Sequence, residues 1–233
     1  MNHIKCLWLW TLLLMSSATA FSSDYPKGLK KEWKKATTYV EQHRSEWQAE
    51  FDLFGIDEDM AIAIIFPELL RYSQWQDQLE TSVNALYVSQ GRSGADFSIG
   101  QFQMKPSFAE QVDADWNASA LAIDYNFYFD IRDNADARRA RLSRIGTIQG
   151  QCRYLSLFIL LQMAKHPQLA SLPKEEQVRL LATAYNTNYA STYDRLKQRS
   201  HERRFHTDLI PTRFTRYYGY SDLAVEAYRH LKK

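Results

Sequence analysis

Residues 57–68 read Asp-Glu-Asp-Met-Ala-Ile-Ala-Ile-Ile-Phe-Pro-Glu, and this stretch decides the fold. Asp57 is placed to cap a helix, with Glu58 and Asp59 in a first turn where acids complement the helix dipole. Residues 60–66 are apolar on every face, which predicts a helix buried on all sides. Glu68 follows this run directly after Pro67. A carboxyl is therefore expected beside a large apolar surface.

The rest of the chain also has the patterns of helices. Its 233 residues include only 8 Gly and 6 Pro, which counts against a sandwich or barrel with many turns. Residues 98–104 are expected to form a short strand or a turn. We predict an all-α single domain with at most a short β element near residues 89–104. Helices are expected over residues 28–50, 76–87, 134–165 (with a break or kink near Gly146 or Gly150), 174–185 and 222–231, and from Pro106 onward.

The N-terminus resembles a secretory signal peptide. Lys5 precedes the apolar residues 6–15, and small residues then end in Ala18-Thr19-Ala20. The apolar run is shorter than the roughly 20 residues that span a bilayer, although an uncleaved anchor stays an alternative. We therefore expect an exported protein, periplasmic or secreted and associated with the cell envelope, with no stable membrane span. The expected parts are a signal peptide (1–20), an N-terminal helical segment (21–54) and the main domain (55–233).

Cleavage after residue 20 would leave Cys152 as the lone cysteine, so no internal disulfide is expected. Apolar residues follow it closely, and the best interpretation is a small buried hydrophobe.

Glu68 is the leading candidate for chemistry. On a helix it shares a stripe with Ala61, Ile64 and Ile65, and such surroundings raise the pKa of a carboxyl. A raised pKa keeps a proton available near neutral pH, as a general acid requires. The alternative is a structural glutamate at a helix end that pairs with Arg71, one turn further on.

Three later segments add to this picture. They are Ser-Ile-Gly-Gln-Phe-Gln-Met-Lys-Pro (98–106), Ala-Tyr-Asn (184–186) and Ile-Pro-Thr-Arg-Phe-Thr-Arg-Tyr-Tyr (210–218). In this order after Glu68, they resemble the motif series of lytic transglycosylases of the soluble-lytic-transglycosylase type, relatives of goose-type lysozyme. The resemblance covers about residues 55–220. It implies an α-rich lysozyme-like fold and an enzyme that acts on peptidoglycan glycan strands.

The resemblance implies a role for each matched position. Glu68 would protonate the glycosidic oxygen and then act as base, and Gln103 would hydrogen-bond the sugar. Tyr185 and Asn186 would lie near the catalytic carboxyl. The substrate-binding positions that it implies are Ser98, Gly100, Gln103, Tyr185, Asn186 and Tyr218.

Three of these positions also have an ordinary structural explanation. Gln103 could bond backbone in a turn, Tyr185 could be a core aromatic, and Asn186 could cap a helix end. For Gly100, the resemblance implies that the backbone comes close to substrate, in keeping with its missing side chain.

The chain departs from the family pattern at several positions. Leu69 stands where the family has Ser, Gln101 and Phe102 replace a Leu-Met pair, and Phe214 replaces an acid. The segment between Glu68 and Gly100 also looks longer than usual, which predicts an inserted loop at the groove.

Glycosidases ordinarily use two carboxylates, and the sequence does not identify the second one. Asp96 and Asp77 are the candidates, although both are better explained as solvated acids at a loop or helix start. One carboxylate is enough if N-acetylmuramic acid supplies its own N-acetyl oxygen and 6-hydroxyl, which leaves a 1,6-anhydro end. The alternatives are a hydrolytic muramidase and a catalytically silent glycan-binding or scaffold protein.

Arginines cluster at residues 138–144 and 195–216. Nucleic-acid binding fits these charges but not export or a net charge of only +2 at pH 7. Intervening acids suggest mostly solvated helix faces, and some arginines could meet the carboxylates of peptidoglycan stem peptides. No cofactor is expected. We also expect no metal site, since His201 and His206 are poorly spaced for one helix face.

Overall fold

The computed structural model describes residues 26, 28–72, 80–94, 96–208 and 210–232. Helix α2 (Glu58–Tyr72) lies at the centre of one half of the molecule. It packs against α1 (Lys30–Asp52), α7 (Ile148–Lys165), α8 (Lys174–Asn186) and α10 (Tyr220–Leu231). Every residue from Asp59 to Leu70 is buried. The prediction of a helix buried on all sides is confirmed.

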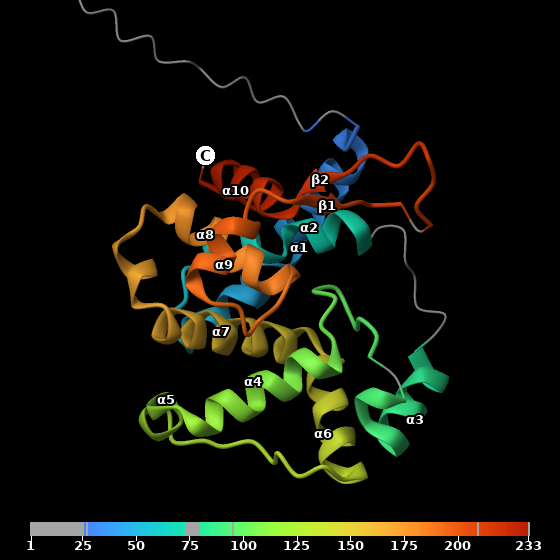
Figure 1. The fold of residues 1–233 in the computed structure, drawn as a ribbon, viewed down its shortest axis with the longest axis vertical. Helices are drawn as coiled ribbons and strands as arrows, with labels where there is room; N and C mark the ends of the chain where they lie inside the picture. The colour runs from blue at the N-terminus through green and yellow to red at the C-terminus, as the bar shows by residue number, and fades with distance from the viewer. Residues whose placement is uncertain (1–25, 27, 73–79, 95, 209, 233) are drawn as a thin grey trace, which may run out of the picture.

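The other half is formed by α4 (Pro106–Ala118), α5 (Ala120–Asp124), α6 (Ala135–Ile145) and α3 (Glu80–Gln90). Helix α7 lies between the two halves and contacts α1 and α2 on one side and α4 and α6 on the other (Figure 1). Short 3₁₀ turns at Gly91–Ser93 and Pro167–Ser171, and helix α9 (Tyr193–Arg199), complete the helical elements of the described chain.

The helix pattern over residues 134–165 divides into α6 and α7 at the predicted place. Gly146 ends α6, and Thr147 caps α7 by accepting a hydrogen bond from the Gly150 amide at 3.1 Å. A Cβ atom at Gly150 would lie 1.8 Å from the Arg144 carbonyl oxygen. Any side chain at residue 150 would therefore collide with the last turn of α6 in this arrangement of the two helices.

An all-α fold with a short β element is confirmed. The expected β feature near residues 89–104 is a single antiparallel bridge between Ile99 and Met104. A second feature lies outside the predicted region: β1 (Arg203–Phe205) pairs antiparallel with β2 (Tyr218–Gly219). The predicted signal peptide and Asp77 lie outside the described residues. None of the helices that the structure describes is long and apolar enough to cross a membrane.

One hydrophobic core joins the N-terminal helix to the rest of the protein. Trp33, Trp47 and Phe51 of α1 are at most 2% exposed and belong to the same cluster as α2 and α7. Cys152 is fully buried in this core, and burial raises the pKa of its thiol. The prediction of a buried, small hydrophobe is confirmed.

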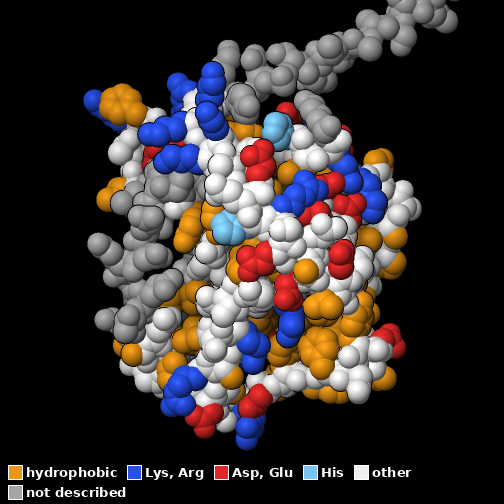
Figure 2. Space-filling model, turned by 180° about the vertical axis from the view of Figure 1, so that it is seen from behind, with side chains coloured by type: hydrophobic (Ala, Val, Ile, Leu, Met, Phe, Trp, Pro, Cys, Tyr) orange, Lys and Arg blue, Asp and Glu red, His pale blue; other side chains and the backbone are white. Residues whose placement is uncertain are grey.

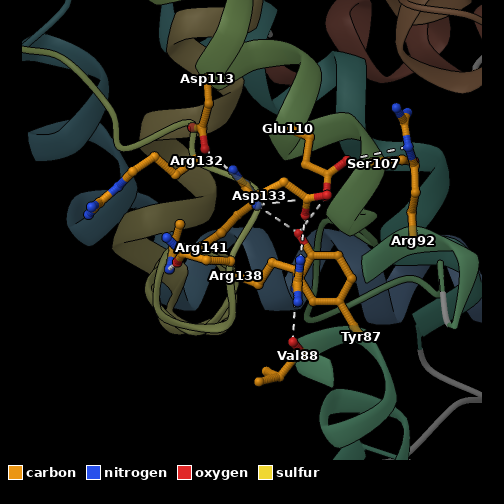
Figure 3. Close-up of polar contacts among 12 residues, drawn as sticks. Tyr87, Val88, Arg92, Ser107, Glu110, Asp113, Arg132, Asp133, Arg138 and Arg141 are labelled. Atoms are coloured by element: carbon orange, nitrogen blue, oxygen red, sulfur yellow. Dashed lines mark hydrogen bonds and ion pairs between the residues drawn. The ribbon is translucent and has the colours of Figure 1, made fainter. Parts of the chain in front are cut away.

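A polar network fastens α3 and α6 to α4, as Figure 3 shows for its Tyr87, Glu110 and Arg141 side chains. The Tyr87 hydroxyl donates to Glu110 at 2.8 Å and accepts from Arg141 at 2.8 Å. Arg141 also donates to Asp113 at 2.9 Å, and the Tyr154 hydroxyl donates to the other oxygen of Asp113 at 2.7 Å.

For Arg138 and Arg141, this network corrects the expectation of a mostly solvated face, whereas Arg139 of the same cluster is exposed as expected. Arg138 and Arg141 are only 9% and 3% exposed. Arg138 donates to the Val88 carbonyl at 2.8 Å and pairs with Asp133, so it too links α6 to α3 (Figure 3). The Arg141 charge is thus paired with Asp113 inside the protein.

Asp113→Ala is expected to destabilise the fold by about 3 kcal/mol, because it leaves the Arg141 guanidinium buried without its main counter-charge. Asp136→Ala is the control, since its side chain is 86% exposed and pairs with exposed Arg139. The control should cost less than about 1 kcal/mol. Urea unfolding measures both, and equal losses would contradict the structural role of the network.

Candidate active site

A groove of about 440 Å³ lies where the two halves of the molecule meet. It is lined by the end of α2, the segment 96–108, α4, and the end of α8 with the loop that follows it. Five of the residues predicted for the site, and the candidate acid Asp96, line this one groove: Glu68, Asp96, Ser98, Gln103, Tyr185 and Asn186. Residues that are more than 100 positions apart in the chain are therefore neighbours here.

Glu68 sits in the last part of α2 and is only 7% exposed. Burial raises the pKa of its carboxyl from 4.5 to about 7, and the positive charge of Arg71 opposes this rise. Its Oε2 atom is buried without a hydrogen-bond partner among the described residues, and no ion pair there joins it to Arg71. A protonated carboxyl near neutral pH is the state that this environment favours.

Tyr220 is the residue at this site that sequence reasoning missed. It is the first residue of α10, it is 3% exposed, and its nearby hydroxyl helps to restrain the rise in the Glu68 pKa. The contact falls short of a formed hydrogen bond, because the Tyr220 hydroxyl has no partner in the part of the chain that the structure describes. The sequence offered one indication of this residue, because the last motif ends on Tyr218 and Tyr220 follows two residues later.

Tyr218 itself is not at the groove. It lies in β2, is 9% exposed and is not among the residues that line the groove. Its hydroxyl lies close to Gly28, where a Cβ atom would approach it to 3.1 Å. The structure therefore places Tyr218 in the packing between β2 and the start of α1.

The turn over residues 98–104 presents Gln103 to the groove. Ile99 and Met104 exchange both backbone hydrogen bonds, at 2.9 and 3.1 Å, and the turn between them closes tightly enough to give Gln103 a φ of +52°. The Gln103 side-chain amide donates to the Gly100 carbonyl at 2.8 Å. The residue thus bonds backbone in a turn, as the structural alternative predicted, and also lines the groove. Ser98, the first residue of this segment, is exposed and lines the groove.

Gly100 has a different reason to be glycine from the one expected. Its φ is +65°, and a Cβ atom would lie 1.8 Å from the side-chain nitrogen of Gln151. Gln151 is fully buried, donates to the Ile145 carbonyl and accepts from the Phe102 amide, both at 2.8 Å. Close packing of Gln151 under the turn therefore explains the glycine, which is not among the residues lining the groove.

Tyr185 holds the turn against α8. Its hydroxyl donates to the Phe102 carbonyl at 2.6 Å, and its ring packs edge-on against Phe108 and Phe158. Burial and the neighbouring Glu68 carboxyl raise the pKa of Tyr185 well above its usual value, which keeps the hydroxyl protonated. Asn186, the last residue of α8, is exposed at the groove.

The Asp96 carboxylate is hydrogen-bonded to the first turn of α4. It accepts hydrogen bonds from the Ser107 amide at 3.0 Å and the Ser107 hydroxyl at 2.8 Å, and Lys105 lies 3.7 Å away. A carboxylate here satisfies an orphan amide of the first turn and complements the helix dipole. The helix-start role is thus seen directly, on a side chain that also lines the groove.

Among the described residues, no group of three or more His, Cys, Asp or Glu side chains could hold a metal ion. No family model, no curated protein and no solved structure matches the chain. The chemistry of this site must be argued from its own residues.

Glu68→Gln is expected to change how stability depends on pH. The folded protein keeps a proton on Glu68 up to about pH 7, whereas an ordinary carboxyl releases it near 4.5. Wild-type stability relative to the variant should therefore fall as pH rises through this window, by about 3 kcal/mol in total. Urea unfolding of both proteins from pH 4 to 8 measures the difference. Parallel curves would contradict a raised pKa.

Gly100→Ala is expected to cost at least about 3 kcal/mol, because it adds a collision with Gln151 to the strain of positive φ. Gly55→Ala is the matched control. Gly55 has a similar φ of +62° and nothing within 4 Å of an added Cβ, so it should cost only about 1 kcal/mol. Thermal unfolding compares the two, and an equal cost would remove the packing explanation.

Proposed function

We propose that this protein is a peptidoglycan lytic transglycosylase with a lysozyme-like fold. It would cleave the bond between N-acetylmuramic acid and N-acetylglucosamine and leave 1,6-anhydro-muramyl ends. One observation carries the proposal: a buried carboxyl with a pKa of about 7 opens onto a groove that also collects Gln103, Tyr185 and Asn186. The order of the sequence motifs supports the same assignment, and the N-terminal sequence supports export to the cell envelope.

The reaction needs only one protein carboxyl. Protonated Glu68 gives its proton to the glycosidic oxygen as the bond from that oxygen to the anomeric carbon breaks. The N-acetyl oxygen of the same muramic acid bonds to the anomeric carbon in its place. Glu68, now a carboxylate, then takes the proton of the sugar's 6-hydroxyl, whose oxygen displaces the N-acetyl oxygen and closes the anhydro ring. Both attacks are intramolecular, so high effective concentration favours them over attack by water.

The surroundings of Glu68 suit both halves of this cycle. Desolvation keeps the acid protonated until substrate arrives, and Arg71 and the Tyr220 hydroxyl stabilise the carboxylate after the proton has left. A pKa near the working pH allows the group to serve in turn as acid and base. Cleavage is accordingly expected to decline as pH rises above about 7.

The second candidate function is a hydrolytic muramidase in which Asp96 places water. The position of Asp96 on the groove wall favours it. Its two oxygens, however, already accept from the Ser107 amide and hydroxyl, and this favours the single-carboxylate route.

Mass spectrometry of digested peptidoglycan tests the assignment. Wild type should release anhydro-muramyl products, and Glu68→Gln should lower the rate by about 10³-fold because it removes the transferable proton. Glu41→Gln, at an exposed position on α1, controls for the loss of one charge.

Other outcomes point elsewhere. Reducing-end products that vanish in Asp96→Asn would establish the muramidase. Binding to sacculi without any cut, by wild type and Glu68→Gln alike, would establish a silent glycan-binding protein. Unchanged turnover in Glu68→Gln would refute the site.

A further inference from the structure

A second pocket, of about 260 Å³, adjoins the groove; we call it the arginine pocket. It lies between the ends of α2 and α8, the segment from α9 to β1, and the start of α10. Arg71, Asn186 and Thr187 line both the groove and the arginine pocket. The two hollows therefore share a wall that stands one helical turn from Glu68.

The charge in the arginine pocket is unbalanced. Arg71, Arg199 and Arg204 line it, and Glu202 is the one acid among its lining residues. Glu202 lies 3.4 Å from Arg199 and 3.5 Å from Arg204, so both share a single carboxylate. Arg71 lies over the Phe205 ring at 5.3 Å, and its Nε atom is buried without a hydrogen-bond partner among the described residues.

A buried hydroxyl adds an independent observation. Tyr220 lines the arginine pocket, is 3% exposed, and its hydroxyl lacks a partner within the described chain. Burial raises the pKa of Tyr220 well above the usual value, so the hydroxyl stays protonated and can donate. Buried polar groups in folded proteins almost always have a partner. Glu68 acts on this hydroxyl from the groove side, and an acceptor bound in the pocket would give it the hydrogen bond that it lacks among the described residues.

The wider surface points the same way. Lys and Arg side chains gather at the end of the molecule that carries β1 and β2 (Figure 2). Exposed residues there include Arg203, Arg204, Arg213 and Arg216. A positive field of this kind attracts anions toward a nearby hollow.

We propose that the arginine pocket binds a carboxylate of the glycan substrate, next to the bond that Glu68 would cleave. Guanidinium groups and a tyrosine hydroxyl together form charge-assisted hydrogen bonds of the kind that carboxylates accept. The carboxylate can come from two sources: the lactyl ether of N-acetylmuramic acid, or the peptide that is attached to it. This inference rests on the proposed function for the identity of its ligand.

The test is calorimetric binding to protein that carries Glu68→Gln, so that no ligand is consumed. The ligands are a peptide-free tetrasaccharide of alternating N-acetylglucosamine and N-acetylmuramic acid, its carboxyl-amidated form, and the same glycan with intact peptides. Adding Arg199→Gln and Arg204→Gln should weaken binding of the acidic ligand by about tenfold and leave the amidated ligand unaffected. Arg195→Gln is the control, an exposed arginine of α9 outside the pocket.

A further variant separates binding from folding. Glu202→Gln frees Arg199 and Arg204 from their shared partner and should tighten binding of the acidic ligand, a change that damage to the fold would not produce. Loss of affinity for the peptide-free acid identifies the lactyl source, and loss only with the peptide-bearing glycan identifies the peptide. Equal affinities for acidic and amidated ligands in all variants would overturn the proposal.

The two proposals can fail separately. Arginine-dependent binding without cleavage by the wild type would refute the transglycosylase and keep the pocket. Cleavage by the wild type, with a ligand affinity that does not change in the arginine variants, would keep the transglycosylase and refute the pocket.

Discussion

The central constraint on this molecule is a carboxyl that shares a helix with seven consecutive apolar residues. Helix α2 must be covered on every side to hide residues 60–66, and α1, α7, α8 and α10 provide that cover. The same cover removes water from Glu68 and raises its pKa to about 7. Ionising this group in the folded state is costly, so the packing that stabilises the helix also determines the protonation state of the site. Burial of α2 by its neighbouring helices thus explains both the packing of the core and the raised pKa of Glu68.

The turn at residues 98–104 shows how the groove wall is held. Gln151 supports the turn from below through Phe102, Tyr185 holds it from α8 through the Phe102 carbonyl, and Asp96 ties its approach to the first turn of α4. The contacts of Gln151 and Tyr185 with Phe102 join residues that are 49 and 83 positions apart in the sequence. The wall is therefore tied to three helices, because the backbone N–H and carbonyl of Phe102 are bonded to α7 and α8 and the Asp96 side chain is bonded to α4.

The sequence was most informative where a local pattern decides the structure. An all-round apolar run is enough to predict α2, and glycines near residue 146 are enough to predict the break between α6 and α7. Long-range pairing could not be predicted. Arg141 is buried because Asp113 comes to it from 28 positions away, and β1 and β2 are too short to show alternation. Tyr220 was missed in favour of Tyr218 because the motif ends on Tyr218, two residues before Tyr220.

Arg71 stands in the wall between the groove and the arginine pocket, and this position has a consequence for the acid beside it. Its positive charge lowers the proton affinity of Glu68. An anion seated against Arg71 would offset that charge, and Glu68 would then hold its proton more firmly. Binding of an acidic ligand would thus by itself favour the protonated form of Glu68. With a neutral chain in the same groove, Glu68 would be less fully protonated, so acidic and neutral ligands would differ in the protonation of Glu68 as well as in their contacts.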